Sequence, residues 1–336
     1  MPETVSVLIT NPYTRAQADA IAAVDPRVRI LPIYSPTGSP SREEWPRAEG
    51  ADLDALLAQA DVMLGFVVSA EWLEKMPRLK WLQLSSAGAD RVIKAGIFDK
   101  MPDLMLTTSS GIHEIPISEH IVASILYFSR GFYRAVRNQP LHKWERFTAD
   151  EACAHNVCFI GYGPIARRAA TLCKALGMRC VAVRASLLEQ QPGFEAVDRF
   201  YPLGDLNEAI AGADYVVVAA PHTPTSEKMI GREQLAAMKP SAVLVNISRG
   251  ALVDETALTE ALQEGRIAGA ALDVFVQEPL PAESALWDLP NVLITPHNAG
   301  SNPSYDERVV ELFRENLRRY LSGETLRNLV IKERGY

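Results

Sequence analysis

The sequence predicts an α/β protein with two Rossmann-like or flavodoxin-like domains built on parallel sheets. Three observations support this. Short runs rich in β-branched residues alternate with helical segments along all 336 residues, as in βαβ units. These runs are almost continuously apolar, as expected for strands covered on both faces. The chain is also longer than one typical domain of roughly 100–200 residues.

The apolar runs give the expected strands, and two longer patterns give the main helices. Ile117–Arg137 contains no Gly or Pro before Gly131, and Pro303–Leu321 is amphipathic and ends before Gly323. The polar and aromatic stretch between these helices, at 138–155, predicts an arm that packs on another surface. The expected strands are 5–10, 28–33, 61–67, 80–84, 104–107, 157–160, 180–184, 215–219, 242–247, 268–274 and 292–295.

Composition excludes several classes of function. The net charge of −7 argues against a nucleic-acid surface, which needs clustered positive charge. No apolar run reaches the ~18 residues of a membrane span, and no leader pattern precedes the first strand, so we expect a cytoplasmic protein. The four cysteines form no C-x-x-C pair, and three of them lie in or beside predicted buried strands and helices, so we interpret them as buried small side chains rather than zinc ligands.

A phosphate-binding turn is predicted where a strand, a G-x-G-x-x-A motif and a helix follow one another at 157–176. Gly161 permits the tight turn, and Gly163 lets a pyrophosphate approach the backbone. Pro164 suits the first helical position but lacks an N–H, so we expect the Ile165 N–H to bind phosphate. The alternative is an ordinary strand–helix turn.

The end of the next strand indicates which dinucleotide is bound. An NAD site has an acidic residue here, whereas this chain has Arg184 followed by Ala185 and Ser186. A guanidinium can bind a 2′-phosphate through two hydrogen bonds, and Ser186 can donate another. We therefore predict that NADPH is preferred and NADH is possible. The alternative is that Arg184 is a surface arginine at a strand end.

Three further motifs follow in order, V-N-I-S-R-G-A-L-V-D at 245–254, A-L-D-V-F-V-Q-E-P at 271–279 and I-T-P-H-N-A-G at 294–300. With these motifs the chain resembles the D-isomer-specific 2-hydroxyacid dehydrogenases over essentially its whole length. That family includes glyoxylate/hydroxypyruvate reductases, D-lactate dehydrogenases and phosphoglycerate dehydrogenases. The resemblance implies that Arg249, Glu278 and His297 are the catalytic residues.

The chemistry explains these residue types. Reduction of a 2-keto acid to a D-2-hydroxy acid requires a hydride at C2 and a proton at its oxygen. Imidazole titrates near neutral pH, so His297 is the expected proton donor, and Glu278 would stabilise its imidazolium form. Arg249 would bind substrate oxygens and polarise the C2 carbonyl. Each residue alone could be a structural loop residue, but their joint occurrence after consecutive strands argues against that interpretation.

The resemblance implies further contacts. Ser86, Ala87 and Gly88 would present backbone N–H groups to the substrate carboxylate, although a plain turn is the alternative. Asp273 would contact the nicotinamide carboxamide, or else cap a loop. Pro221 lies near the expected cofactor, beside His222, whose role stays open.

The resemblance also implies the domain organisation. Residues 1–110 and 299–336 would form a discontinuous substrate-binding domain, and 111–298 the dinucleotide-binding domain, with the active site in the cleft between them. A homodimer would form through the 117–150 helix and arm, with Trp144 reaching the partner's site. Phe66 and Trp144 would favour an apolar or aromatic substrate side chain.

Two other readings compete with the 2-keto acid reductase. Formate dehydrogenases share the fold but have Gln where Glu278 stands, so Glu278 argues against them. A non-enzymatic, NAD(H)-sensing interaction protein of the C-terminal-binding-protein corepressor type can keep the catalytic residues. Turnover of NADPH with a 2-keto acid separates that alternative from an enzyme.

Overall fold

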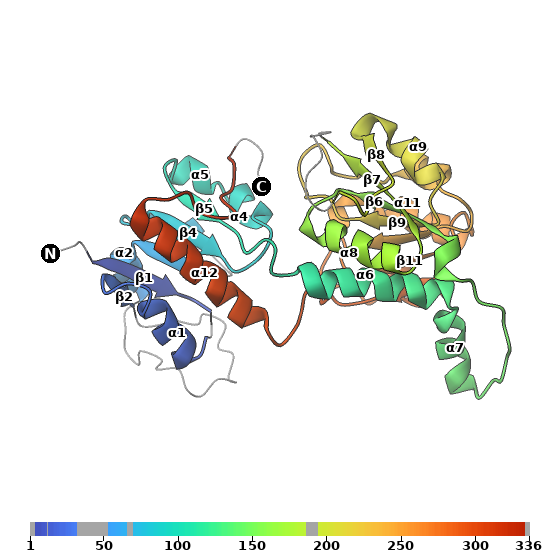
Figure 1. Cartoon of the computed structure of the whole chain (residues 1–336), viewed down its shortest axis with the longest axis horizontal. Coiled ribbons are helices and arrows are strands. Elements are labelled where there is room, and N and C mark those ends of the chain that lie inside the picture. The colour runs from blue at the N-terminus through green and yellow to red at the C-terminus, as the bar shows by residue number, and fades with distance from the viewer. Residues whose placement is uncertain (1–3, 12, 32–52, 66–69, 186–193, 333–336) are drawn as a thin grey trace. The chain divides into compact units, whose positions relative to one another are not determined.

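The computed structural model describes residues 4–11, 13–31, 53–65, 70–185 and 194–332. The chain divides into two compact units (Figure 1). Unit 1 comprises residues 1–112 and 302–336, and unit 2 comprises residues 113–301. Each unit is built around an entirely parallel sheet, which confirms the predicted fold class.

Unit 1 contains a five-stranded sheet in the order β2-β1-β3-β4-β5. Alternate side chains of β1 enter the two cores expected for a strand covered on both faces. Val7 and Ile9 pack in the same cluster as residues of α1 and α12, whereas Leu8 packs with residues of α2 to α5. Its elements are β1 (Val5–Ile9), α1 (Arg15–Ala22), β2 (Val28–Ile30), α2 (Leu53–Gln59), β3 (Val62–Gly65), α3 (Ala70–Glu74), β4 (Trp81–Leu84), α4 (Asp90–Lys94), α5 (Ile97–Lys100), β5 (Met105–Thr107) and α12 (Tyr305–Ser322).

Unit 2 contains a seven-stranded sheet in the order β12-β11-β10-β9-β6-β7-β8. None of the helices in the described ranges, in either unit, is long and apolar enough to cross a membrane. The strands of unit 2 are β6 (Asn156–Ile160), β7 (Arg179–Arg184), β8 (Arg199–Pro202), β9 (Tyr215–Val218), β10 (Val243–Asn246), β11 (Gly269–Leu272) and β12 (Val292–Ile294). Its α-helices are α6 (Glu114–Ser129), α7 (Phe132–Asn138), α8 (Pro164–Ala175), α9 (Leu206–Ala211), α10 (Arg232–Ala237) and α11 (Glu255–Gln263).

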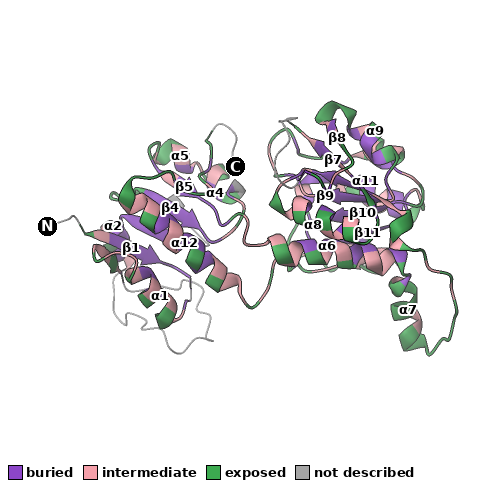
Figure 2. Ribbon diagram, in the orientation of Figure 1, coloured by how far each residue is buried: buried purple, intermediate pink, exposed green. Residues whose placement is uncertain are grey.

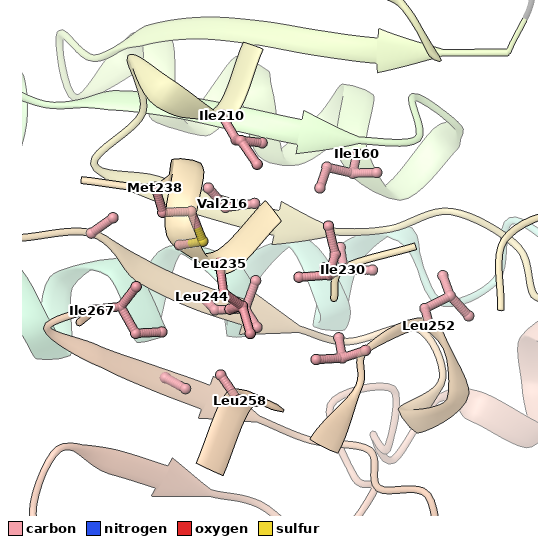
Figure 3. Packing of buried hydrophobic residues seen from close by; sticks show 14 of the residues in the cluster. Ile160, Ile210, Val216, Ile230, Leu235, Met238, Leu244, Leu252, Leu258 and Ile267 are labelled. Atoms are coloured by element: carbon pink, nitrogen blue, oxygen red, sulfur yellow. The ribbon is translucent and has the colours of Figure 1, made fainter. Parts of the chain in front are cut away.

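The two faces of the unit 2 sheet are buried by different helices. Val157 and Phe159 of β6 pack with residues of α6 and α8. Ile160, on the other face, belongs to the same buried cluster as Ile210 of α9 and Leu258 of α11 (Figure 3). Burial of both faces explains why the central strands β9, β10 and β11 are almost continuously apolar, and all residues of these three strands are buried (Figure 2).

The order of the strands identifies the edge where a ligand is expected. The chain runs outward from β6 through β7 to β8, then returns to β9 on the other side of β6 and runs outward to β12. In open α/β sheets, ligands bind at the carboxyl ends of the strands where the direction of winding reverses. In unit 2 this point lies between the loops that follow β6 and β9.

Strand β8 was not among the predicted strands. Among the described residues it pairs only with β7, so it is an edge strand of this sheet. Arg199 and Pro202 begin and end it, and the missing N–H of a proline is tolerated at an edge. Because β8 is covered less than a central strand, its sequence lacks the apolar run that marked the others.

The single helix predicted at Ile117–Arg137 is wrong, because the structure has two helices there. Gly131 adopts a left-handed conformation (φ +66°) between α6 and α7, and a Cβ at this position would lie 2.5 Å from the ring of Phe147. Helix α7 has no buried residue and begins an arm that continues to Asp150 (Figure 2). Trp144 in this arm is 96% exposed.

Candidate active site

The three motifs after the phosphate-binding turn follow three neighbouring strands of unit 2. Arg249 comes after β10, Glu278 after β11 and His297 after β12. These strands are adjacent and parallel, so their carboxyl ends lie at one edge of the sheet. The sheet therefore brings together loops that lie far apart in the sequence.

His297 and Glu278 are in direct contact. The Nδ1 atom of His297 lies 2.7 Å from Oε2 of Glu278, and Oε1 of Glu278 accepts a hydrogen bond from the Phe275 N–H at 3.0 Å. His297 has a left-handed backbone (φ +50°), and its own N–H donates to the Asp273 carbonyl at 2.9 Å. With the carboxylate at Nδ1, the imidazole keeps Nε2 for a second partner.

The charge of Glu278 is stabilised by its neighbours. Partial burial acts to raise the pKa of this carboxyl, but the hydrogen bonds from His297 and the Phe275 N–H, with the charges of His297 and Arg249, outweigh it. The net effect is a lowered pKa. Glu278 is therefore a carboxylate at neutral pH and can stabilise an imidazolium beside it.

Arg249 occupies a turn that is fixed by Asn246, a residue of the 245–254 motif to which the sequence analysis gave no role. The Asn246 amide donates to the Arg249 carbonyl at 3.0 Å and accepts from the Ser248 N–H at 3.2 Å. A Cβ on Gly250 would lie 2.0 Å from the carbonyl carbon of Phe275, so the turn packs directly on the segment that leads to Glu278. The structure therefore brings Arg249 close enough for its charge to act on Glu278.

Asp273 is buried beneath the His297 loop. Its carboxylate accepts hydrogen bonds from the Thr295 hydroxyl at 2.6 Å and from the N–H groups of Asn298 and Ala299 at 3.0 Å each. This is the capping role that sequence reasoning left as an alternative, whereas the contact to a nicotinamide stays a prediction. The Thr295 hydroxyl also lies 3.5 Å from Nε2 of His120 on α6.

The two glycines of the G-x-G-x-x-A turn differ in backbone conformation and in the space around them. Gly161 has a φ of +88°, and a Cβ there would lie 2.7 Å from the backbone of Ala220. Gly163 directly precedes α8 with a φ of −90°, and, apart from its chain neighbours, no atom of the described residues lies within 4 Å of where its Cβ would be. Among the described residues neither conformation nor packing requires glycine at 163, and its contact with a phosphate stays a prediction. Pro164 and Ile165 form the first turn of α8.

Arg184 ends β7, and its guanidinium lies 4.8 Å from the ring centroid of Phe194. Phe194 belongs to a cluster with Tyr162 and Phe200, so the arginine rests on an aromatic platform. Within the described ranges, its Nη1 atom is buried without a hydrogen-bond partner. Ser186, predicted to act beside it, lies outside the described residues, as does Phe66.

The loop after β9 completes this edge of unit 2. The Pro221 carbonyl accepts a hydrogen bond from the Ser226 hydroxyl at 2.8 Å, and the Ser248 hydroxyl donates to the Ala220 carbonyl. Ser248 thus connects the Arg249 turn to the loop that packs on Gly161. The neighbouring His222 is half-buried.

The remaining predicted site residues lie in unit 1. Ser86, Ala87 and Gly88 follow β4, and the Ser86 hydroxyl donates to the Gly88 carbonyl at 2.9 Å. Ala87 is exposed, and the other two are half-exposed. They form a bend with no regular secondary structure, as an anion-binding loop requires.

Comparisons with known proteins point to one family, the D-isomer specific 2-hydroxyacid dehydrogenases. Residues 122–299 match the family model described as D-isomer specific 2-hydroxyacid dehydrogenase, NAD binding domain. A glyoxylate reductase from Korarchaeum cryptofilum is 33% identical, over 84% of each chain. A D-3-phosphoglycerate dehydrogenase from Methanocaldococcus jannaschii is 30% identical over 97% of this chain, which spans only 59% of that longer protein. A D-isomer specific 2-hydroxyacid dehydrogenase from Xanthobacter autotrophicus Py2, solved with NADPH and MES, superposes with a TM-score of 0.83 at 26% identity and covers 99% of this chain and 100% of its own.

Proposed function

Because the chain belongs to the D-isomer specific 2-hydroxyacid dehydrogenase family, we propose that it is an NADPH-preferring reductase of small 2-keto acids. The product is a D-2-hydroxy acid. The observation that carries this proposal is the His297–Glu278 contact at 2.7 Å, with the Arg249 turn packed beside it. A proton donor with its supporting carboxylate and a fixed cation are what reduction of a keto group requires.

Each of the three residues has one role. The bound nicotinamide supplies the hydride that reaches C2. His297 donates a proton from Nε2 to the C2 oxygen, and Glu278 stabilises the protonated ring through Nδ1. Arg249 binds the substrate oxygens and withdraws electron density from the C2 carbonyl.

Two features of unit 2 and one solved relative support NADPH as the cofactor. Gly163 leaves its Cβ position open at the start of α8, where helix N–H groups can receive a pyrophosphate. The Nη1 atom of Arg184 has no hydrogen-bond partner among the residues that the structure describes, and Arg184 lies at the strand end where a 2′-phosphate would bind. The relative from Xanthobacter autotrophicus Py2 was solved with NADPH. NADH is the weaker substrate.

The two units have separate tasks in this proposal. Residues 1–110 and 299–336 form the substrate-binding domain, in which Ser86, Ala87 and Gly88 bind the carboxylate. Residues 111–298 form the dinucleotide-binding domain, where Pro221 and Asp273 line the cofactor site.

We propose a cytoplasmic homodimer built on α6 and the arm. The arm exposes Leu141 and Trp144, and α7 exposes Phe132 and Val136. Burial of such side chains against a second copy would stabilise a dimer. Sedimentation of a monomer at micromolar concentration would contradict this, and Leu141→Asp is expected to weaken the dimer.

The reaction is tested by following NADPH oxidation with glyoxylate, hydroxypyruvate and larger 2-keto acids. His297→Gln is expected to lower kcat by about 10²–10⁴-fold, the usual contribution of a general acid. His155→Asn is the matched control, because His155 precedes β6 and thus lies at the opposite edge of the sheet, beside Asp214. Wild-type turnover by His297→Gln would contradict the mechanism. Tight NADPH binding without turnover of any acid would favour the corepressor-like alternative.

A further inference from the structure

The loop after β4 has three carbonyl groups held by hydrogen bonds, two from other parts of unit 1 and one from the loop itself. The Tyr305 hydroxyl donates to the Ser85 carbonyl at 2.6 Å, and the Ser109 N–H donates to the Ser86 carbonyl at 2.8 Å. The Ser86 hydroxyl donates to the Gly88 carbonyl at 2.9 Å. The orientation of three peptide groups in one short loop is therefore fixed by donors on the carbonyl side.

The opposite side of these peptides carries the N–H groups. In a trans peptide the N–H points away from the C=O, so the N–H groups of Ser86 and Ala87 point away from the Tyr305 hydroxyl and the Ser109 amide. No hydrogen bond within the described part of the chain uses either N–H as its donor. A hydrogen bond to a carbonyl also polarises its peptide, which makes the N–H on the other side a stronger donor.

Tyr305 is suited to act as this donor at any physiological pH. It is the first residue of α12 and is half-buried. Burial raises the pKa of its hydroxyl to about 12, so the hydroxyl keeps its proton. The Ser85 side chain is held in turn by the Asn11 amide at 3.1 Å, which leaves the Ser85 carbonyl as the group that Tyr305 orients.

We propose that Tyr305 is a positioning residue for the substrate, because its hydroxyl holds the Ser85–Ser86 peptide with the adjacent N–H groups directed to the carboxylate of a 2-keto acid. This inference rests on the proposed function, which makes the loop the carboxylate site. Tyr305 touches neither substrate nor cofactor in this role. It acts through the direction and polarity of a single peptide group.

The test is Tyr305→Phe, which removes only the hydroxyl. The KM for glyoxylate and the Kd of oxalate, measured by calorimetry with NADPH present, are each expected to rise about 3- to 10-fold, the effect of one net hydrogen bond. The kcat and the KM for NADPH are expected to stay within about twofold. Tyr320→Phe is the control, since Tyr320 lies on the same helix with its ring against Trp81.

The outcomes separate this inference from the proposed function. If Tyr305→Phe lowers the Tm but leaves the KM and the oxalate Kd unchanged, the tyrosine is structural and the inference is wrong. Tyr305-dependent oxalate binding in a chain that reduces no 2-keto acid would support the inference and contradict the reaction. Should the phenylalanine variant not fold, 3-fluorotyrosine at position 305, a stronger donor, is expected to lower the KM, and an unchanged or raised KM overturns the inference.

Discussion

The Nδ1 atom of His297 and the Oε2 atom of Glu278 lie 2.7 Å apart, although loops after two different strands carry them. Because a charge-assisted hydrogen bond contributes about 1.5–3 kcal/mol, Glu278→Gln is expected to lower kcat by about 10- to 100-fold. Steady-state kinetics with saturating NADPH measures this. The control substitution is Glu264→Gln, which makes the same change at an exposed position just after α11. A Glu278→Gln variant with unchanged kcat would remove Glu278 from the mechanism.

The lowered pKa of Glu278 also predicts how this pair contributes to stability. Above the ordinary value of 4.5, the carboxylate is ionised in both the folded and unfolded chain, and its contribution to the unfolding free energy is complete. As the pH falls from 4.5 through the lower pKa of the folded state, that contribution is lost. The stability difference between wild type and Glu278→Gln should thus be constant at neutral pH and shrink in acid. Urea unfolding at a series of pH values measures it, and a difference that grows in acid would contradict the sign.

Asp273→Asn is expected to disturb the His297 loop without removing any reacting group. The buried carboxylate accepts from the N–H groups of Asn298 and Ala299, and an amide can replace only one of its two oxygens. We expect kcat to fall by at least about tenfold and the unfolding free energy to fall by about 1–3 kcal/mol. Kinetics and denaturant unfolding check both. Normal stability with normal kcat would show that the capping bonds do not position His297.

Gly161 and Gly163 should respond differently to alanine. At Gly161 the left-handed backbone and the nearby Ala220 backbone both oppose a Cβ, so Gly161→Ala should cost more than about 1 kcal/mol of stability. Gly163→Ala should leave the unfolding free energy almost unchanged and raise the Kd for NADPH by at least about tenfold, since the new methyl group takes the space of a phosphate. Thermal unfolding and fluorescence titration with NADPH separate the two effects. Unchanged NADPH affinity in Gly163→Ala would contradict the phosphate-binding turn.

Arg184→Ala should weaken NADPH binding selectively. Loss of charge-assisted hydrogen bonds to the 2′-phosphate should raise the KM for NADPH by about 10- to 100-fold, while the KM for NADH changes little. Arg199→Ala, which alters another arginine on an aromatic ring at the neighbouring strand, is the control. An equal rise in the KM values for NADPH and NADH would mean that Arg184 only packs on Phe194.

The cysteines should differ in reactivity. Cys153 is exposed, whereas Cys158, Cys173 and Cys180 are buried. Burial raises the pKa of the Cys158 thiol to about 12, and a hydrogen bond that the Cys173 thiol donates to Cys180, together with burial, raises the pKa of Cys173. A thiol reagent at pH 8 should therefore titrate one group per folded chain and all four after denaturation, because the thiolate is the reactive form. Cys153→Ser should abolish the rapid phase, and a remaining rapid phase would locate the exposed thiol elsewhere.

The strands that are covered on both faces could be predicted from the sequence, because each is an apolar run such as Val157–Ile160. The sequence was not sufficient for β8, whose edge position demands little apolar character, or for the break at Gly131, which depends on the Phe147 ring beside it. At the site, motif order was enough to group Arg249, Glu278 and His297. Tyr305 could not be found this way, since it lies outside every quoted motif and acts through a contact to the backbone of the loop after β4. Asn246 lies inside the 245–254 motif, but the motif does not show its hydrogen bonds to the backbone of the Arg249 turn.

The order of strands in unit 2 separates two kinds of chemistry on opposite sides of β6. Arg184 follows β7 on one side, while the loops that carry Arg249, Glu278 and His297 follow β10, β11 and β12 on the other. If Arg184 selects the dinucleotide as proposed, substitutions that exchange NADPH for NADH can accumulate on one flank of the sheet without altering the proposed reacting groups on the other.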